Sequence, residues 1–67
     1  MRVIPVYPLS IVFGISEQYA YSWIREMGFE LFRYGVPAER LEEFIGMVAG
    51  PSKEAAREYL VSKMEVR

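Results

Sequence analysis

A chain of 67 residues with a net charge of −1 is long enough for one small domain, and without cysteine it has neither a disulfide nor a thiolate metal site. Histidine and aspartate are absent as well, so the five serines lack the partners that usually activate a nucleophile. The composition therefore argues against an enzyme. We expect no cofactor, no bound metal and no small-molecule substrate.

The apolar fraction is high for so short a chain, since 52% of the residues are hydrophobic and 15% are aromatic. A domain of this size buries only about 60% of its unfolded surface. Part of the apolar surface is therefore expected to lie outside and to be covered by self-association. The lack of thermolabile Asn and Cys, with Glu and Arg carrying most of the charge, is typical of a thermophile, and an archaeal or viral protein would fit.

The longest apolar runs are far shorter than the roughly 20 residues that a membrane-spanning helix requires. We therefore expect no membrane partner and a location in the cytoplasm or within a virion.

The first fifteen residues, MRVIPVYPLSIVFGI, are mostly apolar and include the strand-forming types Val, Ile, Tyr and Phe. Pro5 and Pro8 cannot donate a backbone hydrogen bond, so this segment is predicted to be an extended arm or an edge strand, not a central strand. An apolar arm needs a groove to lie in. The small size of the domain favours a groove on a neighbouring subunit.

A helix is predicted over about 17–34, because Ser16 is a suitable N-cap, Glu17 lies in the first turn and Gly35 is a suitable stop. Further aromatic residues lie outside its apolar stripe, which predicts burial on more than one side. Gly28 interrupts the pattern, so it either allows close helix packing or ends the helix early. The apolar stripe comprises Ala20, Trp23, Ile24, Met27, Leu31 and Tyr34.

Two shorter helices are predicted to follow, over about 37–49 and 52–64. Pro37 stands at the favoured first position of the earlier helix, and Gly50 ends it. Ser52 is a candidate cap for the later helix.

The predicted fold is therefore all-α, with three helices in a domain of residues 16–67 that follows the extended arm of residues 1–15. A homo-oligomer is expected, because the interior is too small for the apolar residues. The arm and the aromatic faces of the first helix form the predicted self-association surface, which comprises Val6, Tyr7, Ile11, Phe13, Tyr19, Trp23, Phe29 and Phe32.

The stretch IGMVAGPSKEAAREYL, residues 45–60, joins two amphipathic segments through Gly-Pro-Ser. Residues 44–64 resemble a helix-turn-helix DNA-binding motif, with Gly46 where the helices cross closely and Gly50 at the turn. The resemblance implies a dimeric protein whose later helix reads double-stranded DNA. The DNA contacts that it implies are Ser52, Lys53, Arg57 and Lys63.

Three features depart from that motif: Pro51 replaces a branched apolar residue, Glu54 and Glu58 interrupt the basic face, and the net charge is negative. The same residues also resemble the two-helix part of a ribbon-helix-helix repressor, with residues 32–37 as its strand. That version requires the first helix to stop at Gly28. The residues that it places in the major groove are Leu31, Arg33 and Gly35. Leucine and glycine are poor base readers.

A competing interpretation gives the Gly-Pro-Ser corner no role beyond turning the chain, with Lys53 and Arg57 on a solvated face. The protein is then a structural or adaptor subunit of a homo-oligomeric coat, filament or scaffold, without DNA readout. Binding to a membrane surface is less favoured, because the polar helix faces are acidic or mixed in charge.

Overall fold

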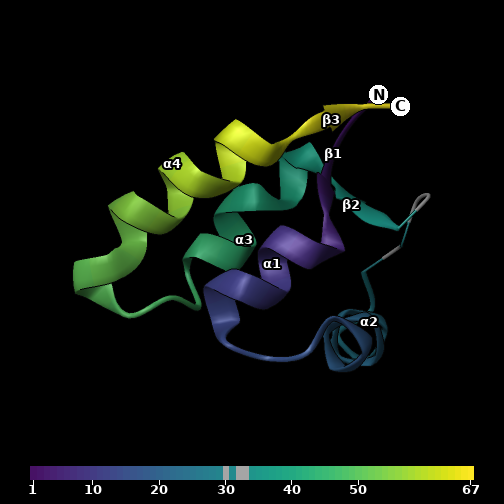
Figure 1. Cartoon of the computed structure of the whole chain (residues 1–67), viewed down its shortest axis with the longest axis horizontal. Helices are drawn as coiled ribbons and strands as arrows, with labels where there is room; N and C mark the ends of the chain where they lie inside the picture. Colours follow the sequence, from purple (N-terminus) through teal and green to yellow (C-terminus); the bar gives the residue numbers. More distant parts are fainter. Residues whose placement is uncertain (30, 32–33) are drawn as a thin grey trace.

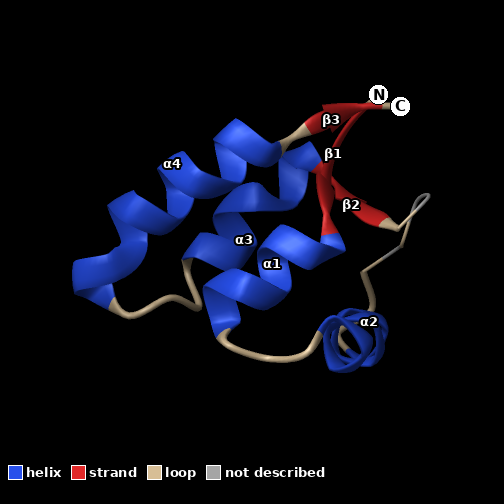
Figure 2. Cartoon of the chain, in the orientation of Figure 1, coloured by secondary structure: helices blue, strands red, loops and turns tan. Residues whose placement is uncertain are grey.

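The computed structural model describes residues 1–29, 31 and 34–67. Within them the chain forms four α-helices and a three-stranded antiparallel sheet (Figures 1 and 2). In chain order the elements are β1 Arg2–Pro5, α1 Val6–Phe13, α2 Glu17–Glu26, β2 Gly35–Pro37, α3 Leu41–Ile45, α4 Lys53–Lys63 and β3 Glu65–Val66. The prediction of an all-α, three-helix fold is therefore wrong, because segments from both ends and the middle of the chain pair as a sheet.

The predicted N-terminal arm supplies the central strand of this sheet, since β1 lies between β2 and β3. Pro5 is the last residue of β1, and the N–H of Val6 donates to the carbonyl of Tyr34 next to β2 at 3.0 Å. Successive residues of a strand point their backbone groups to opposite sides, so the nitrogen of Pro5 faces the side of β3. β3 reaches only as far as Val3, so no donor is needed there.

The remainder of the arm is helix α1, which follows β1 without a linker. Pro8 is its third residue, and the first N–H groups of a helix have no partner inside it, so a proline costs no hydrogen bond at this position. Leu9 is fully buried, and α1 contacts both α2 and α4. The arm thus packs within its own domain, and the expectation that it lies on a neighbouring subunit is wrong.

Helix α2 begins where the sequence predicted. The hydroxyl oxygen of Ser16 accepts a hydrogen bond from the N–H of Tyr19 at 3.1 Å, which caps the helix. The predicted stripe faces the interior over this length, with two buried and two half-buried residues: Ala20, Ile24, Trp23 and Met27.

The same helix ends at Glu26, well before the predicted end near residue 34. Gly28 has a φ of 86°, its N–H donates to the carbonyl of Arg25 at 3.0 Å, and the N–H of Phe29 donates to the carbonyl of Ile24 at 3.3 Å. These bonds form a Schellman motif, in which glycine adopts the left-handed conformation at little cost. Gly28 therefore ends the helix.

The second half of the chain keeps the two predicted helices in altered form. Pro37 belongs to β2, and a 3₁₀ turn, Ala38–Arg40, leads into the short α3. A second 3₁₀ turn, Gly50–Ser52, leads into α4, which ends one residue before the predicted limit of 64. Figure 1 shows α1 and α3 in the middle of the molecule, α2 at one end and the two termini together at the sheet.

Phe44 of α3 stands at the centre of the core, with no exposed surface. Its ring centroid lies 5.0 Å from that of Phe29, 6.1 Å from that of Trp23 and 6.5 Å from that of Phe13. This aromatic cluster joins α1, α2 and α3 into one body. Of the helices that the structure describes, none is long and apolar enough to cross a membrane.

Candidate interaction surfaces

The corner between α3 and α4 carries the side chains predicted to contact DNA. The Lys53 ammonium donates to the carbonyl oxygens of Ile45 at 3.1 Å and Gly46 at 3.3 Å. These carbonyls lie at the end of α3, where the last acceptors of a helix have no partner inside it. Lys53 therefore ties the start of α4 to the end of α3.

Arg57 binds two carboxylates. Its Nε and Nη2 donate to the two oxygens of Glu42 at 2.9 and 2.8 Å, and its Nη1 donates to Glu54 at 2.9 Å. The two-pronged hydrogen bond raises the pKa of Arg57 and lowers the pKa of Glu42 below its ordinary value of 4.5. One guanidinium and two carboxylates carry a net charge of −1, which does not attract a phosphate backbone.

The two other predicted DNA contacts are exposed. The Lys63 ammonium lies 5.6 Å from the centroid of the Tyr59 ring, and the Ser52 hydroxyl makes no capping bond to α4. The four residues thus do not combine into one basic surface, because the two cations nearest the turn have partners inside the fold. DNA binding through them stays a prediction.

The ribbon-helix-helix resemblance requires α2 to stop at Gly28 and a strand before α3, and both features are present. However, this strand pairs with β1 of the same chain, in a register that places Ile4 opposite Val36. Gly35 is buried in that contact, so it is not available to a DNA groove. Arg33 lies outside the described residues.

The residues predicted for self-association fall into two groups. The exposed group consists of Tyr7, Ile11 and Tyr19. The packed group belongs to the core or lies against it, and consists of Val6, Phe13, Trp23 and Phe29. Phe32 lies outside the described residues. A partner can therefore meet the first group but has little access to the second.

A groove of ≈ 260 Å³ runs between α1 and α4 beside part of the exposed group. Tyr7 and Ile11 stand one turn apart on α1, with 57% and 50% of their surface exposed, and form an apolar ridge of which Ile11 lines the groove. The lining residues are all uncharged: Ile11, Val12, Val48, Ser52, Ala55, Ala56 and Tyr59. We call the ridge and the groove together the α1–α4 face.

Sequence reasoning identified the α1 side of this face but missed the α4 side. None of the α4 residues that line the groove, Ala55, Ala56 and Tyr59, is among the residues predicted for self-association. The helical spacing of one segment shows which residues share a side, but it does not show which distant helix packs beside them. The missing information was the contact between α1 and α4.

The described residues contain no group of three or more His, Cys, Asp or Glu side chains placed to hold a metal ion. Comparisons of the chain with protein-family models, with curated proteins and with solved structures found no match.

Proposed function

We propose that the protein is a non-enzymatic interaction protein that self-associates, and that its α1–α4 face binds the same face of a second copy. The observation that carries this proposal is the uncharged groove beside the exposed ridge of Tyr7 and Ile11. Its role would be that of a structural or adaptor subunit.

A twofold contact brings a surface patch against its own copy, so like charges in the patch would repel each other. The residues that line the groove carry no charge, which removes this obstacle. Ile11 belongs to both the ridge and the lining of the groove, so a twofold contact centred near it would bring the ridge of one copy against the groove of the other. This self-complementarity favours a second copy over an unrelated partner.

The size of the molecule supports the same conclusion. A stable interface usually covers about 800 Å² on each partner. The surface of the chain is 4258 Å², so such an interface would cover roughly a fifth of it, which amounts to one face of the molecule. The high apolar content of a domain with a small interior is consistent with covering a face of this extent.

The proposal is tested by size-exclusion chromatography with light scattering on the wild type, Ile11→Glu and Val61→Glu. Ile11→Glu places a carboxylate in the interface twice, so we expect this variant to be a monomer while the wild type is a dimer. Val61 is the matched control, because it is similarly exposed, at 46%, and lies about 200° around α4 from Tyr59. Val61→Glu should remain a dimer.

Thermal melts followed by circular dichroism establish that both variants are folded. A wild type that is monomeric at high concentration would overturn the proposal, and so would equal dissociation of both variants. Wild type that comigrates with a random-sequence DNA duplex, with affinity that falls steeply as salt rises, would support DNA readout instead.

A further inference from the structure

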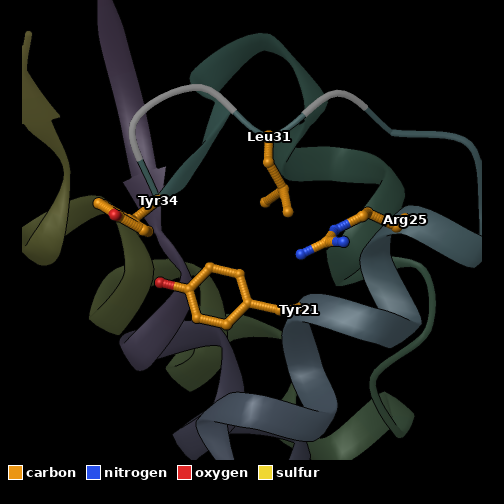
Figure 3. Close-up of a pocket in the computed structure, with 4 residues that line it drawn as sticks. All are labelled: Tyr21, Arg25, Leu31 and Tyr34. Atoms are coloured by element: carbon orange, nitrogen blue, oxygen red, sulfur yellow. The ribbon is translucent and has the colours of Figure 1, made fainter.

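A larger hollow, of ≈ 460 Å³, lies beside α2. It is lined by Tyr21 and Arg25 of α2 together with Leu31 and Tyr34. Figure 3 shows Leu31 above Tyr21, the Arg25 guanidinium pointing in from one side, and Tyr34 at the opposite edge. Pockets that bind small molecules measure about 300–1,000 Å³, so this hollow has the volume of a ligand site.

Arg25 supplies the cationic side of the hollow. It stands one helical turn after Tyr21, so both side chains project from the same side of α2. The guanidinium forms no ion pair with any residue that the structure describes. Its planar fork of N–H donors matches the two oxygens of a carboxylate.

The other walls are aromatic or aliphatic. The ring centroids of Tyr21 and Tyr34 lie 6.0 Å apart with their planes at 81°, an edge-to-face contact. Leu31 forms the wall opposite Tyr21. Among the lining residues that the structure describes, one cation stands beside apolar and aromatic walls, which suits a ligand with an apolar, flat body and a single anionic group.

Two charged side chains also act on Tyr21, at the edge of the hollow. Burial raises the pKa of Tyr21, and so do the charge of Glu17 and the hydrogen bond between Tyr21 and Glu17, so the hydroxyl keeps its proton. Arg67 acts on Tyr21 in the opposite direction from Glu17. Arg67 is itself paired with Glu65 at 2.6 Å, so its charge is balanced, and Arg25 is left as the cation among the described lining residues.

Tyr34 has a backbone conformation that its side chain does not explain. Its φ is 66°, in the left-handed region where glycine and asparagine are favoured, although 73% of the side chain is exposed and little core packing is gained. Strained residues of this kind cluster at ligand sites. A tyrosine at this position brings a phenol ring to the edge of the hollow.

We propose that this hollow binds a small aromatic carboxylate, with the carboxylate on Arg25 and the ring between Leu31 and Tyr21. The site is separate from the α1–α4 face and does not depend on self-association. This proposal differs from the expectation, based on composition, that the protein has no small-molecule substrate.

The test is a titration of the ¹⁵N-labelled protein, followed by amide chemical shifts, with phenylacetate and with its neutral isostere phenylacetamide. We expect saturable shifts at Tyr21, Arg25 and Tyr34 with a Kd of about 1 mM for phenylacetate, as suits a ligand of this size. Phenylacetamide should bind about tenfold more weakly, because it lacks the charge that pairs with Arg25. Equal binding of the two probes, or no saturable shift with phenylacetate, would overturn the proposal.

Variants separate binding from folding. Arg25→Gln should weaken phenylacetate about tenfold and leave phenylacetamide unchanged, whereas Lys63→Gln, which removes the same charge from α4, should change neither. Tyr34→Asn keeps a residue suited to the left-handed conformation, so it should retain the melting temperature and lose affinity for both probes. Unchanged phenylacetate affinity in Arg25→Gln or in Tyr34→Asn would overturn the site.

Discussion

Gly35 illustrates how a single residue takes its role from its tertiary neighbours. The sequence suggested a helix stop, but in the structure Gly35 lies in β2, opposite Pro5 of the central strand. A Cβ added there would lie 3.0 Å from Cβ and Cγ2 of Val3 and 3.1 Å from the carbonyl oxygen of Ile4. Val3 is fully buried, so it has no room to move aside. The close approach of β2 to β1 therefore depends on the missing side chain.

Gly35→Ala is accordingly expected to lower the free energy of unfolding by about 1–3 kcal/mol, the usual cost of overpacking a well-packed site. Urea denaturation measures this change. Gly50→Ala serves as the control, because a Cβ at Gly50 meets nothing within 4 Å. Equal stability of the two variants would show that the contact between β2 and β1 tolerates a methyl group.

At the scale of the elements, the start of α2 followed from local chemistry, whereas its length did not. Ser16 caps the helix as its sequence position predicts. The end depended on Gly28, for which the sequence allowed either close packing or a stop, because apolar residues continue beyond it at helical spacing. The stop is consistent with the chain continuing into β2, which pairs with β1.

Ser16→Ala should destabilise the protein by about 1 kcal/mol, because the N–H of Tyr19 loses its acceptor. Urea denaturation of this variant is best compared with Ser22→Ala, an exposed serine inside the same helix. That control should be neutral or slightly stabilising, since alanine is the better helix former. If both variants lost the same amount of stability, the loss in Ser16→Ala would not come from the missing cap.

At the scale of the whole molecule, the ion pair between Arg57 and Glu42 joins α4 to α3 across a separation of 15 residues. From the sequence, Arg57 was a candidate DNA contact. Their pairing gives both a structural role. The basic residues of an amphipathic helix therefore do not identify a DNA-reading surface until their tertiary partners are known.

The contribution of this ion pair to the free energy of unfolding should fall as the pH is lowered. Arg57 lowers the pKa of Glu42 in the folded state below 4.5, the value expected for the unfolded chain. The pair therefore stabilises the protein above pH 4.5, and this stabilisation is lost as the pH falls through the pKa of the folded state. Glu42→Gln should reduce the melting temperature by no more than a few degrees at pH 7, and the difference should vanish in strong acid.

Thermal melts across pH and salt check this expectation, and high salt should shrink the difference, because the pair is exposed. The control is Glu42→Gln in an Arg57→Gln background, where the pH-dependent difference should be absent. If it persists there, the partner of Glu42 is not Arg57.

The sequence by itself determined the features that depend on residues a few positions apart. The cap at Ser16, the inward stripe of α2 and the turn at Gly50–Ser52 were all readable, because capping, helical spacing and turn chemistry are local. Tyr7 and Ile11 could be named for a different reason, as apolar residues of a segment expected to contact a neighbour, although that segment was predicted to be extended and is helix α1 in the structure.

Only the tertiary structure decided which distant segments meet. Pro5 is tolerated in a central strand because β3 ends before reaching it, and this depends on residues at the other end of the chain. The groove between α1 and α4 and the hollow around Arg25 likewise combine side chains from separate segments. Strand pairing and helix packing join residues far apart in the chain, so the fold class and both proposed binding surfaces depend on the tertiary structure.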